Sequence, residues 1–118
     1  MSQALIDKIR AQRQTDIEAA GLAFIVSRPT DLDVQEMRGK TLPALDLLKK
    51  YVKGWRGVKE SDLINGGVPK LVEFTQELFS EWVGDRPDIF NPLVSGIIAA
   101  YEQHAQQQAD TLKKPDAG

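Results

Sequence analysis

Residues 52–58 read Val-Lys-Gly-Trp-Arg-Gly-Val and place one tryptophan, Trp55, between two glycines. A large aromatic side chain at such a point is typically a packing anchor, and flanking glycines let the backbone turn sharply. The stretch follows a strongly helical segment, so we expect that helix to end at Gly54. None of these side chains is chemically reactive, which favours a domain that positions surfaces over an enzyme.

The composition is that of one soluble globular domain. The chain has 118 residues, of which 42% are hydrophobic and 27% charged, and this length supports a single core. The net charge of −2 lacks the basic excess of a general nucleic-acid-binding protein. The absence of cysteine excludes disulfides and thiolate metal sites and fits a reducing cytoplasm. No apolar run approaches the roughly 20 residues that cross a bilayer, and the amino end does not resemble a signal peptide.

The amino-terminal quarter predicts a helix and then a small β-hairpin. Residues 2–13 form an amphipathic pattern, and two runs rich in β-forming residues then flank a glycine, which predicts a hairpin near 15–28. Leu22, Phe24 and Val26 alternate with period two and are expected to share one face. The alternative is a single long helix that continues through the first of these runs.

The remaining sequence predicts mostly helices, and their first residues can be recognised from N-capping residues. Good N-capping residues precede four of them: Thr30, Thr41, Thr75 and Asn91. Asp33 lies three residues after Thr30, where its carboxylate can return to the cap. Pro92 is expected at the first position of the last helix, because proline is preferred there. Gly96 inside that helix costs about 1 kcal/mol relative to alanine, so we expect another helix to approach it closely.

The predicted fold is therefore mainly α (α+β), with about four to five helices and a short N-terminal hairpin. Residues 1–112 form a single helical domain, and residues 113–118 form a flexible tail. Residues 55–74 are the least regular part, with a turn at 65–67. A connection of this length in a small domain is usually functional or mobile.

The sequence offers little catalytic chemistry. His104 is the one histidine, and no carboxylate lies near it on its own helix. One histidine without cysteine does not form a usual zinc site. Asp31 and Asp33 lie in an acidic cluster that is better explained by helix capping than by a metal ion. A basic cluster around Trp55 is explained by the favourable interaction of cationic side chains with the carboxyl end of a helix. We therefore predict no enzyme activity, no catalytic residue, no cofactor and no metal.

An ordered set of motifs across residues 15–104 resembles the tail assembly chaperones of long-tailed (siphovirus-type) bacteriophages or prophages. Each motif is weak alone, and their order carries the resemblance. The motifs are Phe24-Ile25-Val26-Ser27-Arg28-Pro29-Thr30, Val52-Lys53-Gly54-Trp55-Arg56-Gly57-Val58, Val72-Glu73-Phe74, Phe79-Ser80-Glu81-Trp82 and Asp85-Arg86-Pro87.

The resemblance implies a small, mainly helical protein of the host bacterial cytoplasm that is absent from the mature virion. Such chaperones bind the tape measure protein and keep its apolar helices soluble until tail tube subunits polymerise around it. The tail tube protein is then a second candidate partner, and self-association is open. Many members also have a longer form made by ribosomal frameshifting. We expect no nucleic-acid partner and no membrane partner.

The family supplies no diagnostic binding motif, so the candidate partner surface follows from the residues alone. A groove between the helix before Gly54 and the final helix, with a tryptophan at each end, would accept apolar helices. Its residues are Leu48, Val52, Trp55, Trp82, Ile97 and Tyr101. The alternative is that both tryptophans are buried core.

Two other functions remain open from the sequence. One is a different phage morphogenesis adaptor, such as a head–tail connector or a tail terminator, which would stay in the finished particle. The other is a small DNA-binding regulator, which would need a basic recognition helix that the acidic balance disfavours.

Overall fold

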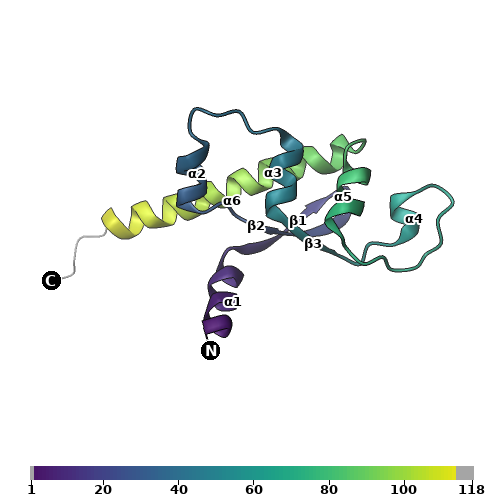
Figure 1. The fold of residues 1–118 in the computed structure, drawn as a ribbon, viewed down its shortest axis with the longest axis horizontal. Helices are drawn as coiled ribbons and strands as arrows, with labels where there is room; N and C mark the ends of the chain where they lie inside the picture. Colours follow the sequence, from purple (N-terminus) through teal and green to yellow (C-terminus); the bar gives the residue numbers. More distant parts are fainter. Residues whose placement is uncertain (1, 114–118) are drawn as a thin grey trace.

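Residues 52–56 form a strand in the computed structural model, which describes residues 2–113 (Figure 1). This strand, β3 (Val52–Arg56), joins β1 (Gln14–Ala19) and β2 (Leu22–Ser27) in an antiparallel sheet of order β1-β2-β3. The predicted hairpin is present, but the prediction that it is the only β-structure in a mainly α domain is wrong. Within the described residues the fold is α+β, with six helices and three strands.

Pairing with β2 explains why the helix stops before Gly54. Helix α3 (Ala44–Tyr51) ends at Tyr51, and Val52 is already extended. In the sheet Val52 lies opposite Val26, and Trp55 lies opposite Phe24. These four side chains are buried, so the burial gained across the strands outweighs the local preference for helix.

The β1–β2 turn consists of Ala20 and Gly21. Both have positive φ, 51° and 80° respectively, as in the type I′ turn that suits a two-residue hairpin. Phe24 and Val26 point to the buried face, and Leu22 is half-buried beside them. The predicted shared face of β2 is therefore confirmed.

The helices agree with some predicted starts and not with others. Besides α1 (Ser2–Gln12) and α3, they are α2 (Asp31–Met37), α4 (Glu60–Leu63), α5 (Gln76–Val83) and α6 (Pro87–Lys113). Thr30 and Thr75 cap α2 and α5 through their side chains, and Asp33 completes a capping box with Thr30. The predicted cap at Thr41 is wrong, because α3 begins after Pro43.

The last helix begins earlier than predicted. It starts at Pro87, so Asn91 is not its cap and Pro92 lies inside it. Burial explains the earlier start, because Ile89, in the added turn, is fully buried. Helix α6 is described as far as Lys113, so Lys113 is helical, and the rest of the predicted tail, 114–118, lies outside the described residues.

One face of the sheet carries the hydrophobic core, which α3, α5 and α6 cover. The buried residues are Ala19, Phe24, Val26, Leu48, Tyr51, Val52, Trp55, Val58, Phe79, Val83, Ile89, Leu93 and Ile97. At Gly96, α6 lies against Ile17 of β1. The close approach predicted there is real, but its partner is a strand and not a helix. The opposite sheet face carries an exposed ion pair, Arg56 Nε to Asp16 Oδ2 at 2.9 Å.

The molecule is elongated, with extents of 64 × 37 × 26 Å. Figure 1 shows the reason: α6 runs along the long axis, and its carboxyl half extends past the sheet. Helix α1 projects from one end of the sheet, and the segment that contains α4 projects from the other.

Candidate functional site

Four of the six predicted partner-binding residues lie in the core. Leu48, Val52 and Ile97 have at most 1% of their surface exposed, and Trp55 has 9%. Helices α3 and α6 pack directly on each other where the groove was expected, and a hollow of about 180 Å³ beside Leu45 remains. In this conformation the four side chains therefore present almost no surface to a partner.

The two tryptophans do not mark opposite ends of a groove. Their rings are 6.0 Å apart and nearly perpendicular, and they share one cluster with Phe24, Phe74 and Phe79. Trp55 is anchored further by its indole Nε1, which donates to the Val72 carbonyl oxygen at 2.8 Å. Trp82 is only half-buried, and its Nε1 has no acceptor within residues 2–113. Trp55 is a core anchor, whereas Trp82 reaches the surface.

The irregular segment forms an ordered projection. We call residues 57–74 the arm. Its two sides are joined by backbone hydrogen bonds, from Glu60 N to Lys70 O at 2.9 Å, Ser61 N to Val68 O at 3.0 Å and Val72 N to Val58 O at 2.9 Å. The Glu60 carboxylate also accepts from the Val68 amide at 2.8 Å. Helix α4 lies within the arm, and the buried Val58 holds the arm's base in the core.

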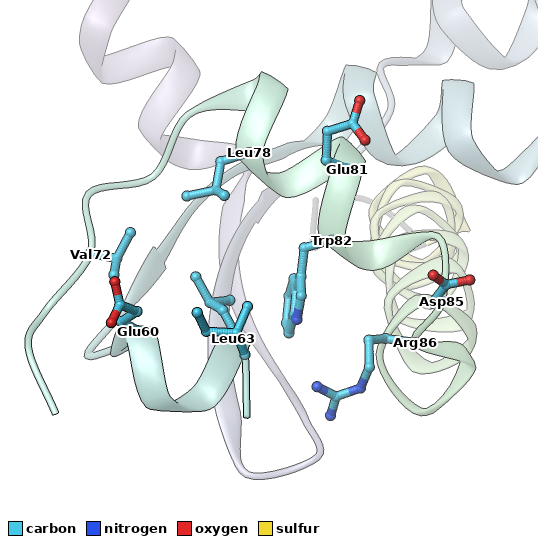
Figure 2. Close-up of a pocket in the computed structure, with 9 residues that line it drawn as sticks. Glu60, Leu63, Val72, Leu78, Glu81, Trp82, Asp85 and Arg86 are labelled. Carbon is cyan, nitrogen blue, oxygen red and sulfur yellow. The ribbon is translucent and has the colours of Figure 1, made fainter. Parts of the chain in front are cut away.

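Between the arm and α5 lies an apolar groove of about 640 Å³, which we call the arm groove. Leu63 and Ile64 come from the arm's helical turn, Val72 from its returning side, and Leu78 and Trp82 from α5. Figure 2 shows Leu63, Leu78 and Trp82 pointing into this space from opposite sides. These apolar residues are at least partly exposed, and Ile64 has 57% of its surface exposed. An exposed apolar concavity of this kind typically marks an interaction site.

The rim of the arm groove is acidic. Glu60, Glu81 and Asp85 border it, and Arg86 is the one basic residue in its lining. The Arg86 charge is largely matched, because Nη2 lies 2.8 Å from Asp88 Oδ2. Hydrogen bonding in this pair lowers the pKa of Asp88 and raises that of Arg86. The guanidinium also lies 5.3 Å from the Trp82 ring centre, which fits a cation–π contact. A partner with excess positive charge suits this rim.

Tyr101, the sixth predicted residue, takes part in a polar contact between α2 and α6. Its hydroxyl donates to Asp31 Oδ1 at 2.9 Å, and Gln108 Nε2 donates to Oδ2 at 3.2 Å. His104 Nε2 lies 3.3 Å from the same oxygen. The hydrogen bond from Tyr101 is the main cause of the lowered pKa of Asp31, and the same bond raises the pKa of Tyr101. The carboxylate beside His104 therefore belongs to Asp31 of α2, which is far from His104 in the sequence. The spacing of residues along α6 does not reveal this contact.

Comparison with known proteins adds no assignment. Neither protein-family models nor curated proteins nor solved structures match the chain. Within residues 2–113, no helix has the length and apolar character needed to span a membrane. The same residues contain no group of three or more histidine and carboxylate side chains placed to share a metal ion.

One feature of the sequence points to the arm groove. Residues 55–74 combine irregular backbone with several apolar side chains, among them Leu63, Ile64 and Val72. These residues follow no single period, so no amphipathic face is visible. Their common surface exists only because the arm folds back on itself and faces α5.

Proposed function

We propose that this chain is a non-catalytic tail assembly chaperone that holds apolar helical segments of a tape measure protein in the arm groove. The observation that carries the proposal is the pairing of an apolar floor with an acidic rim on a well-packed body. An amphipathic helix can lay its apolar face into such a groove. Basic residues that flank that face would then meet Glu60, Glu81 and Asp85.

The ordered motifs that resemble the chaperone family support the same function. A chaperone of this kind needs to bind many similar helices weakly. A shallow groove suits this task because it makes few specific polar contacts. The core tryptophan, Trp55, supports the body and does not contact the client in this proposal.

The test is co-expression with a very long helical protein encoded by a neighbouring gene, which this proposal expects to be the tape measure protein. We expect the tape measure protein to be soluble with the chain and insoluble without it. The variant Ile64→Glu places a charge on the groove wall at a position that is already 57% exposed, and should reduce the soluble fraction. The control Leu32→Glu changes a 62% exposed residue in α2, outside the groove, and should have no effect.

Two results would overturn the proposal. One is equal solubility of the tape measure protein with and without the chain. The other is stoichiometric incorporation of the chain into purified particles, which would favour a head–tail connector or tail terminator.

A further inference from the structure

We infer that α1 of one copy binds in the arm groove of a second copy, so that the chain self-associates head to tail. The first observation is that α1 buries none of its residues against the rest of the described chain, residues 2–113. All of its residues are exposed, including Leu5 (60%), Ile6 (38%) and Ile9 (43%). These three residues are spaced one and three apart and form one apolar stripe. An isolated helix of 11 residues is marginal in water without packing.

The charge of α1 complements the groove. Residues 2–13 carry Lys8, Arg10 and Arg13 against one acid, Asp7. The groove rim has three carboxylates, and its single arginine is paired with Asp88. A basic helix with an apolar stripe therefore fits an apolar floor with an acidic rim. Pairing of two α1 helices would instead bring two basic segments together.

Helix α1 cannot enter the groove of its own chain. It is joined to β1 through Arg13 alone, and the Arg13 carbonyl accepts from the Arg28 amide at 2.9 Å. This junction lies at the open end of the hairpin, where Gln14 pairs with Ser27. The arm leaves β3 at the opposite end of the sheet, beyond the pair of Ala23 and Arg56. Figure 1 shows α1 and α4 on opposite sides of the sheet. The occupant is therefore a second copy.

This contact joins two different surfaces, so each copy offers one helix and one groove. Such an interface closes into a ring or continues as an open chain. It also fills the groove with a helix of the kind proposed as client. Self-association and client binding then compete, and client binding releases α1. The inference uses the groove's apolar and charged surface and does not depend on the client's identity.

The test uses engineered cysteines, because the chain has none. Variants Ile6→Cys and Ile64→Cys, one of them isotope-labelled, are mixed under mild oxidation, and disulfide-linked species are identified by mass spectrometry. We expect heterodimers between the two variants. The matched control pairs Ile6→Cys with Leu32→Cys, an exposed site outside the groove, and should give much less product. Heterodimer formation no greater than in this control overturns the inference, as does faster cross-linking of Ile6→Cys with itself.

Light scattering of the full chain gives a second readout. We expect the average mass to rise with concentration and to fall to that of a monomer in Leu5→Glu. This change cannot disturb the core, because α1 contributes nothing to it. A wild-type chain that stays monomeric at all concentrations overturns the inference. If that monomer still keeps the tape measure protein soluble, the proposed function stands while self-association fails.

Discussion

The contact between α6 and β1 makes Gly96→Ala a sharp test of the fold. A methyl group at this position would overlap Ile17 Cδ1 and would lie 3.1 and 3.2 Å from its Cγ1 and Cγ2. Three atoms of one side chain would have to move together. Overpacking of this kind costs about 1–3 kcal/mol, whereas alanine gains about 1 kcal/mol over glycine in a helix. We expect the variant to lose about 1 kcal/mol of unfolding free energy.

The double variant separates the two effects. Ile17→Val removes Cδ1, the closest atom, at its own cost of about 0.5–1.5 kcal/mol. In that background we expect Gly96→Ala to become neutral or stabilising, which corresponds to a coupling free energy of about 1–2 kcal/mol. Urea unfolding followed by far-ultraviolet circular dichroism measures each free energy by linear extrapolation.

Gly84→Ala is the matched control. Gly84 has helical dihedrals, φ −57° and ψ −29°, and an added methyl group there meets open space. It should be neutral or stabilise the protein by up to about 1 kcal/mol. The reasoning is refuted if Gly96→Ala stabilises the protein as Gly84→Ala does, or if its effect is unchanged by Ile17→Val.

Three further predictions concern the turn, the tryptophans and pH. Ala20→Asn should raise the unfolding free energy by about 1 kcal/mol, because asparagine tolerates the positive φ of 51° better than alanine; a lower melting temperature would contradict this. Trp55→Phe should cost about 1–3 kcal/mol more than Trp82→Phe in urea unfolding, because only Trp55 has a hydrogen bond whose loss leaves a carbonyl unpaired; equal costs would argue against that bond. Asp31→Asn should destabilise the protein at pH 7. The hydrogen bond from Tyr101 lowers the pKa of Asp31 in the folded protein. The wild type should therefore have the larger unfolding free energy above the ordinary aspartate pKa of about 3.9, and this difference should vanish as the pH falls through the lowered pKa of the folded state. A difference that persists below that pKa would contradict the assignment.

The features that the sequence predicted correctly are those governed by near neighbours. The hairpin depends on alternation within β2 and on a glycine in the turn. The caps at Thr30 and Thr75 need only the next three residues. Local chemistry also identified Trp55 as an anchor, and its burial and hydrogen bond agree with that role.

The third strand was missed because the residue that Val52 pairs with, Val26, lies 26 residues earlier in the chain. In the sequence the helical run continues through Lys53 as far as the expected stop at Gly54, and Val52 lies on the apolar side of that predicted helix. Only the pairing of Val52 with Val26 shows that the chain is extended there. Because this strand was missed, the predicted partner surface was also misplaced: Val52 and Trp55 belong to the buried face of β3. The contact of His104 with Asp31 was missed for the same reason.

The division between core and groove explains why binding and stability can be tested separately. The residues that hold the body together lie between the inner face of the sheet and the helices that cover it, and they are almost fully buried. The groove is built from residues that are at least partly exposed, such as Ile64, and α1 contributes nothing to the core. A charge placed at Ile64 or Leu5 therefore changes a contact surface while the core stays intact. If either substitution unfolded the protein, the separation of body and binding surface would be wrong, and both proposals would lose their structural basis.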